Sequence, residues 1–171
     1  MNKNKLMIAR AIIILLLILS SEAVMTRDSG LEAYTRAPAG YGKVNFGMSK
    51  KQVRQIIINE GLVVAIETDT VILIPAESFG EKTHILYSFT PITQKCMNIS
   101  IYFSSDDIKA LHKRVRKALI DKYGKPYSEY VDGISLPLWE WENIKINLIT
   151  FGRDNLLVLS YADQDLADIG R

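Results

Sequence analysis

The sequence has one cysteine and two histidines among its 171 residues. A single cysteine excludes an intrachain disulfide framework, and it excludes a zinc or iron–sulfur site built on the cysteines of one chain. Two histidines are too few for a histidine-rich metal centre. The chain is 48% hydrophobic, with only 10 glycines and 5 prolines, which is typical of a globular protein and not of a low-complexity one. We therefore expect a folded domain with no metal ion and no cofactor.

Catalytic motifs are also missing. The sequence contains no Gly-x-Ser-x-Gly, no His-Glu-x-x-His and no phosphate-binding glycine loop. Glu140 and Glu142 are two residues apart in a predicted strand and could form an acid/base pair, although an ordinary outward strand face has the same pattern. We assign no catalytic, cofactor-binding or metal-binding residue. The possibility that the chain is an enzyme whose active-site residues come together only in the folded protein stays open.

The first 23 residues have the composition of a secretory signal peptide. Lys3, Lys5 and Arg10 are basic, and the nine residues 11–19 are all apolar. The segment Ser21-Glu22-Ala23 fits a small-x-Ala cleavage site. The apolar run is shorter than the roughly 20 residues that span a bilayer. We expect residues 1–23 to be a cleaved signal peptide, with an uncleaved anchor as the alternative.

Cleavage changes the charge balance of the chain. Residues 1–23 hold three of the 21 basic residues and one of the 19 acidic ones, so the mature chain has 18 of each. A nucleic-acid-binding protein is expected to keep a basic excess. The sequence therefore predicts an exported protein, periplasmic or secreted, that has no nucleic-acid partner and no stable membrane span after cleavage.

After the signal we expect a flexible arm over 24–42, because this segment is polar and contains glycine and proline, and then a single α+β domain over 43–171. Ser49 and Gln52 form a capping box that predicts a helix over 50–59. Five apolar residues with helical spacing predict a second helix over 105–123, capped by Ser104 and ended by Gly124: Ile108, Leu111, Val115, Ala118 and Leu119.

Segments with β-branched residues and alternating polarity predict the strands, at 62–67, 70–75, 82–90, 95–103, 136–142, 144–151 and 156–161. The segments 76–81 and 127–133 are predicted as loops, and 162–171 as a frayed tail or a short helix. The fold class that follows is α+β: an antiparallel sheet of six or seven strands with two helices packed on one face. The order of elements also suggests an α-β-β-β unit in tandem.

Two features are candidates for a partner surface. Trp139 and Trp141 are two residues apart, so they share a face of their strand, and they could be an exposed binding platform or a cover for the core. The second feature is the basic outer face of the helix at 105–123. Its cations could bind an acidic partner or simply face solvent: Lys109, Lys113, Arg116 and Lys117.

The segment Gly47-Met48-Ser49-Lys50-Lys51-Gln52-Val53 resembles the helix start of small exported bacterial modules. Examples are the small lipoprotein of the outer-membrane β-barrel assembly machine and, in its tandem helix-and-sheet design, β-lactamase inhibitor protein. The present chain lacks the lipid-anchoring cysteine of the first and the disulfide cysteines of the second. The resemblance implies a binding or scaffolding module of the cell envelope.

The functional prediction is a non-catalytic exported envelope module that binds another envelope protein or a cell-wall component. Two alternatives stay open. One is a small exported hydrolase or an enzyme inhibitor, and the other is a carrier of a lipid or small ligand in a cavity between sheet and helices.

Overall fold

A computed structural model describes residues 36–131 and 134–169 of the chain. The predicted signal peptide and most of the predicted arm lie outside these residues. The described chain confirms the predicted α+β class: one large antiparallel sheet, a small hairpin and three helices. Within the described residues, no helix is long and apolar enough to span a membrane.

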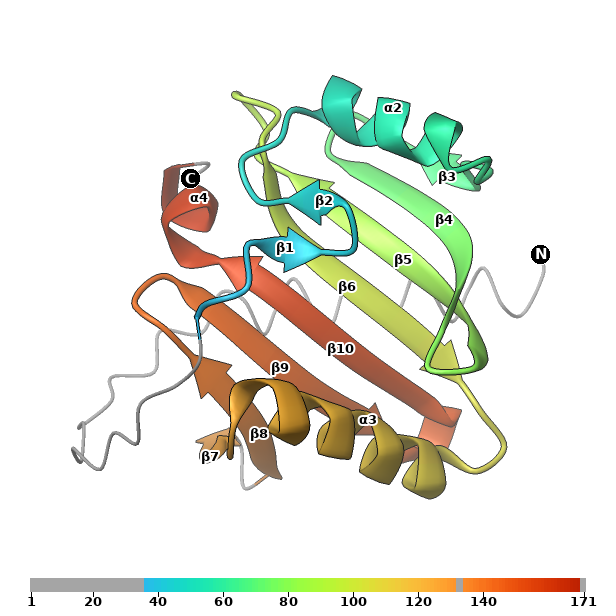
Figure 1. The fold of residues 1–171 in the computed structure, drawn as a ribbon, viewed down its shortest axis with the longest axis vertical. Coiled ribbons are helices and arrows are strands. Elements are labelled where there is room, and N and C mark those ends of the chain that lie inside the picture. Colours follow the sequence, from blue (N-terminus) through green and yellow to red (C-terminus); the bar gives the residue numbers. More distant parts are fainter. Residues whose placement is uncertain (1–35, 132–133, 170–171) are drawn as a thin grey trace. The chain divides into compact units, whose positions relative to one another are not determined.

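The large sheet is continuous, and its strands lie in the order β3-β4-β5-β6-β10-β9-β8-β7 (Figure 1). β3 has only two residues, so seven strands have ordinary length, as predicted. The strands are β3 (Ile66–Glu67), β4 (Val71–Ser78), β5 (Glu81–Phe89), β6 (Cys96–Ser104), β7 (Tyr127–Val131), β8 (Ile134–Glu140), β9 (Ile144–Phe151) and β10 (Leu156–Asp163).

Each half of the sheet follows one helix and runs in chain order from an outer edge to the centre. α2 (Lys50–Asn59) precedes β3 to β6, and α3 (Ile108–Tyr123) precedes β7 to β10. The predicted unit has three strands, whereas each observed unit has four. In the first unit one of the four is the two-residue strand β3. The last strands of the two halves, β6 and β10, pair in the middle from Leu156↔Ser104 to Ala162↔Asn98. This pairing joins the two halves into one sheet.

α2 and α3 begin and end at the residues that the local capping signals predict, except at the start of α3. Ser49 caps α2 and forms the predicted capping box with Gln52, and Gly61 follows the helix end with a φ of 69°. α3 is capped by Asp107 and not by Ser104, because the Asp107 carboxylate accepts the backbone N–H of Ala110 at 3.0 Å. Ser104 is still paired in β6.

Two predicted loops and the end of the predicted arm form regular structure instead. β4 continues through the predicted loop at 76–81, and Phe79 and Gly80, both with positive φ, turn the chain into β5. The predicted loop at 127–133 contains β7, which pairs with β8. At the end of the predicted arm, β1 (Gly40–Tyr41) pairs with β2 (Val44–Asn45). The C-terminal segment forms α4 (Gln164–Ile169), which agrees with the short helix that was one of its two predicted forms.

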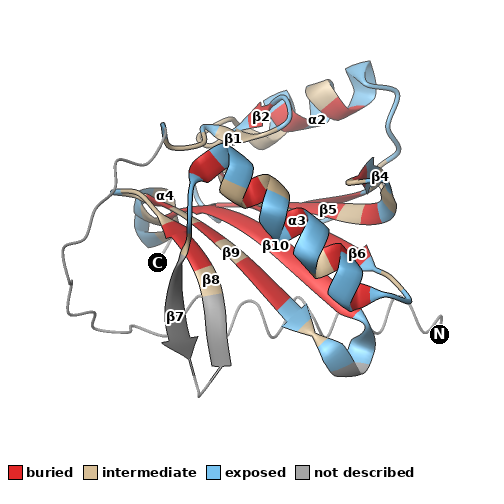
Figure 2. Ribbon diagram, turned by 60° about the horizontal axis from the view of Figure 1, so that its bottom comes forward, coloured by how far each residue is buried: buried red, intermediate tan, exposed pale blue. Residues whose placement is uncertain are grey.

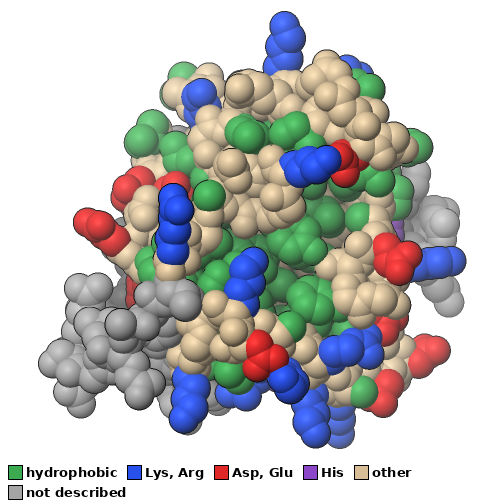
Figure 3. All heavy atoms as spheres, in the orientation of Figure 1, with side chains coloured by type: hydrophobic (Ala, Val, Ile, Leu, Met, Phe, Trp, Pro, Cys, Tyr) green, Lys and Arg blue, Asp and Glu red, His purple; other side chains and the backbone are tan. Residues whose placement is uncertain are grey.

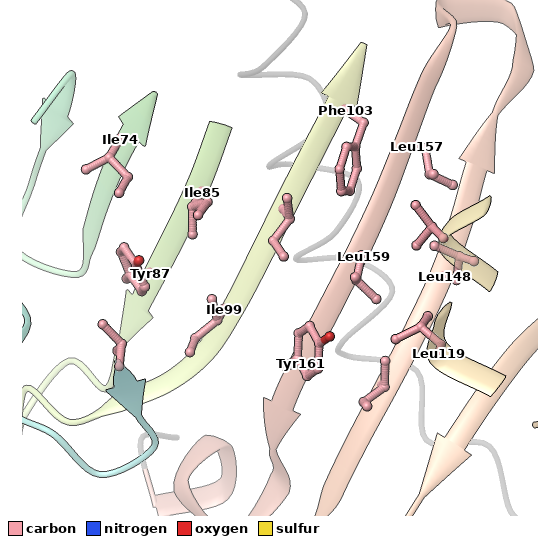
Figure 4. Close-up of a cluster of buried hydrophobic side chains, with 14 of the residues drawn as sticks. Ile74, Ile85, Tyr87, Ile99, Phe103, Leu119, Leu148, Leu157, Leu159 and Tyr161 are labelled. Atoms are coloured by element: carbon pink, nitrogen blue, oxygen red, sulfur yellow. The ribbon is translucent and has the colours of Figure 1, made fainter. Parts of the chain in front are cut away.

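Both long helices lie on the same face of the sheet, and the core fills the space beneath them (Figure 2). α3 contributes a buried stripe that includes Leu111, Val115 and Leu119. The sheet contributes alternate residues of β4, β5, β6, β9 and β10. Among those labelled in Figure 4 are Ile74, Ile85, Tyr87, Ile99, Phe103, Leu148, Leu157, Leu159 and Tyr161. The predicted placement of two helices on one face is therefore confirmed.

Candidate functional site

Trp139 lies inside the core and not on a surface. It belongs to β8, where it pairs with Ile146 of β9, and its side chain is 0% exposed. The indole Nε1–H donates to the carbonyl of Gly124, directly after α3, at 2.8 Å. The hypothesis that Trp139 forms a binding platform is therefore wrong. The sheet face that the two tryptophans share is the face that α3 covers.

Trp141 lies beside Trp139 at the rim of the same core. Its ring packs edge-on against Tyr123, the last residue of α3, with 5.5 Å between ring centroids. The side chain is only partly buried. Both tryptophans thus contact the end of α3, and a structural role accounts for both of them.

The outer face of α3 carries the second candidate surface. Lys109, Lys113 and Arg116 are all exposed, and their spacing of four and then three residues places them on one stripe of the helix. No ion pair holds any of the three within the described chain. We call these three residues the basic stripe. In Figure 3, Lys and Arg side chains gather along the lower edge of the view, where α3 lies in Figure 1.

Neighbouring cations of α3 differ from the basic stripe because they are paired. Lys117, the fourth predicted residue of this surface, makes an ion pair with Asp121 at 2.6 Å within the helix. Arg114 pairs with Glu81 of β5, also at 2.6 Å. His112 lies against the stripe, and its pKa is lowered by burial and by the nearby charge of Arg116. Within the described part of α3, the cations that no ion pair neutralises therefore include Lys109, Lys113 and Arg116.

Glu140 and Glu142, which could have formed an acid/base pair, lie in different surroundings. Glu140 makes an ion pair with Lys145 at 3.3 Å across β8 and β9. Glu142 lies beyond the end of β8 and is exposed. Among the described residues, no group of three or more His, Cys, Asp or Glu side chains could hold a metal ion.

Cys96 is a buried residue of the core. Its side chain is 0% exposed, and burial raises the pKa of the thiol to about 12. A thiol with such a pKa stays protonated at neutral pH and is a poor nucleophile. This geometry fits the interpretation of Cys96 as a small hydrophobic residue at the start of β6.

The structure also shows an apolar surface that sequence reasoning missed. Ile58, Leu62, Val63 and Ile66 are exposed large hydrophobic residues, and Val63 reaches 70% exposure. Ile58 lies in the last turn of α2, Leu62 and Val63 lie in the segment that follows it, and Ile66 is the first residue of the edge strand β3. We call these four residues the edge patch. The sequence predicts a strand at 62–67, and its β-branched residues do not indicate that only Ile66 and Glu67 pair with β4.

Comparison with known proteins adds no functional information. No protein-family model, no curated protein and no solved structure matches the chain. The resemblance to small exported envelope modules therefore stays a prediction, and the function has to be inferred from the residues of these surfaces.

Proposed function

We propose that this chain is an exported, non-catalytic module that binds an acidic protein or cell-wall polymer of the envelope through the basic stripe of α3. The observation that carries the proposal is that Lys109, Lys113 and Arg116 make no ion pair with the residues that the structure describes, next to cations of the same helix that are paired. The composition of residues 1–23 supports export.

The geometry of α3 suits the binding of a negatively charged surface. The helix is held rigidly, because its opposite face is buried in the core along five residues: Ile108, Leu111, Val115, Leu119 and Tyr123. Fixed positive charges attract an acidic partner over a distance of about 8 Å at physiological ionic strength. They also select against basic partners. We therefore expect binding that weakens as salt is added.

A charge-reversal experiment tests this surface. A photoreactive amino acid at the exposed position Ala110 would report contacts of α3 in the envelope of the native host. We expect Lys109→Glu with Lys113→Glu to abolish the cross-linked product. With the purified partner, the double variant should bind about tenfold more weakly at 0.15 M salt, since such charges contribute roughly 0.2–1 kcal/mol each.

The matched control changes the net charge by the same amount at another place. Lys51 of α2 and Lys82 of β5 are both exposed, so Lys51→Glu with Lys82→Glu repeats the charge change away from α3. The control should keep the cross-linked product. Equal loss in both double variants would show that net charge matters and the stripe does not, and no loss in either would refute the binding surface.

Export is tested separately. The mature protein recovered from the envelope or the medium should begin at or near Val24 by N-terminal sequencing. A protein that keeps Met1 and remains in the cytosol would contradict the export part of the proposal without bearing on α3.

A further inference from the structure

The hairpin of β1 and β2 lies over the sheet between α2 and α3, on the face that the two helices share (Figure 1, Figure 2). Val44 of β2 is 2% exposed, and Phe46 packs against the core. The ring of Tyr41 lies against that of Tyr161 in β10, with 5.6 Å between the ring centroids. The hairpin therefore covers the core beside Tyr161.

The backbone of the hairpin is bonded mainly to itself. In the described chain, β1 and β2 pair only with each other. The N–H of Phe46 donates to the carbonyl of Ala39 at 2.8 Å and closes the hairpin. Backbone bonds to the sheet begin at its base, where the N–H of Gly47 donates to the carbonyl of Cys96 at 2.9 Å. Movement of the hairpin about this base would therefore break no strand pairing of the large sheet.

Two polar side-chain contacts hold the hairpin above its base. The hydroxyl groups of Tyr41 and Ser78 share a hydrogen bond of 2.7 Å. Lys43 makes an ion pair with Glu60, directly after α2, and both side chains are exposed to solvent. Exposed ion pairs contribute little to stability. The Tyr41 hydroxyl group therefore makes the stronger of the two contacts.

Glycines occupy two special positions of this segment. Gly47, at the base, has a φ of 77°, and glycine adapts to a change of chain direction there more readily than other residues. Gly40 lies so close to β2 that an added Cβ atom would be 2.1 Å from the carbonyl oxygen of Val44. A side chain at position 40 would therefore force the hairpin out of its present conformation.

Segments with few buried contacts open at a lower free energy than the whole fold. The hairpin is such a segment, because Tyr41 and Phe46 are only partly buried and its backbone bonds are its own. We propose that residues 39–46 form a strap that opens as a unit about Gly47 while the sheet stays folded, and that this opening gives access to Tyr161. The strap is independent of the basic stripe, which lies on the outer face of α3.

Hydrogen exchange of the purified exported protein tests the opening. Relative to its intrinsic rate, the Phe46 amide should exchange about 100-fold faster than the amides of the β6–β10 pairing. Its rate should also depend less on urea, since strap opening exposes less surface than global unfolding. Equal rates with equal urea dependence would overturn the proposal, because the hairpin would then open only with the whole fold.

Two variants separate strap opening from global unfolding. Tyr41→Phe keeps the ring but loses the bond to Ser78, so it should speed exchange at Phe46 about tenfold. Asp107→Ala weakens the cap of α3, so it should speed the β6–β10 amides about fivefold and leave Phe46 unchanged. An unchanged Phe46 rate in Tyr41→Phe, or equal acceleration of both sites in Asp107→Ala, would contradict the strap.

Nitration by tetranitromethane, located by peptide mass spectrometry, tests the access to Tyr161. Gly40→Ala should open the strap and speed nitration of Tyr161 about tenfold or more, because backbone strain of this kind costs roughly a factor of ten or more in the closed state. Gly152→Ala is the matched control and should leave the rate unchanged, since an added Cβ atom there meets nothing within 4 Å. If Gly40→Ala speeds exchange at Phe46 but leaves nitration of Tyr161 unchanged, the proposed access is wrong.

Discussion

Trp139 connects the end of α3 to the sheet, and its environment has a measurable energetic consequence. The indole fills the core and also satisfies the carbonyl of Gly124. Removal of a buried aromatic side chain of this size leaves a cavity, and loss of its N–H leaves a carbonyl without a donor. One residue thus combines packing and hydrogen bonding at the point where the helix ends.

We expect Trp139→Ala to lower the free energy of unfolding by about 3–5 kcal/mol, and Trp139→Phe by about 1–3 kcal/mol, since phenylalanine fills part of the space but donates no hydrogen bond. Urea unfolding followed by circular dichroism measures both values. Ile92→Ala is the control and should cost below about 0.5 kcal/mol, because Ile92 is exposed. A loss below about 1 kcal/mol for Trp139→Ala would contradict the buried position.

The tryptophans also show what the sequence can predict about a single residue. A spacing of two predicts that Trp139 and Trp141 share a face of one strand. Both side chains pack on the same core, although β8 ends at Glu140 and Trp141 lies just past it. The alternation carries no information on which face the helices cover, because that depends on strands and helices far apart in the chain. Exposure of Val63 could not be predicted for the same reason: a β-branched run looks the same whether it is paired or free.

At the scale of elements, α3 shows how a local signal can be shifted by its surroundings. Ser104 and Asp107 are both good capping residues, and they are three positions apart. Pairing with β10 keeps Ser104 in β6, so the chain leaves the strand later and Asp107 becomes the cap. The existence and type of both long helices followed from the sequence, and the start of α3 depended on the sheet.

Because Asp107 and not Ser104 caps α3, two similar substitutions should cause different losses of stability. Asp107→Ala should lower the free energy of unfolding by about 1 kcal/mol, because the N–H of Ala110 loses its acceptor. Ser104→Ala should cost less than about 0.5 kcal/mol, since the exposed Ser104 side chain caps no helix. Thermal or urea unfolding of the two variants side by side gives the comparison. A larger cost for Ser104→Ala would restore the original assignment of the cap.

The pairing of β6 with β10 turns two helix-and-strand units into one molecule with one core. The paired residues, such as Ile101 and Leu159, are more than fifty positions apart in the sequence. Hydrophobic periodicity predicts that such segments are strands, but it does not specify partners at this separation. The α+β class and the helix-covered face were therefore predictable, whereas the strand order and the merging of the two halves were not.

The fold buries several groups that ionise at alkaline pH, three of them in the shared core and Tyr102 outside it. Burial raises the pKa values of Tyr87 and Tyr102 to about 12, and it also raises that of Tyr161, which lies near Tyr123 and Tyr41. The thiol of Cys96 has a pKa of about 12 for the same reason. In the unfolded chain the ordinary values are 10.0 for tyrosine and 9.0 for the thiol. Each group is therefore neutral in the folded protein over a pH range in which it is ionised in the unfolded chain.

Because these folded-state pKa values are raised, the stability they contribute is complete below about pH 9 and is lost as the pH rises towards 12. Above its unfolded pKa, each group lowers the free energy of unfolding by about 1.4 kcal/mol per pH unit. Between pH 9 and 11 the free energy of unfolding should therefore fall by several kcal/mol, on the order of 5. Urea midpoints at pH 8, 9.5 and 11 measure this loss.

Cys96→Ala removes the thiol and should flatten the first part of the decline, between pH 9 and 10. A midpoint that stays constant to pH 11, with tyrosine absorbance at 295 nm titrating near pH 10, would show that these side chains reach water and would contradict their burial in the fold.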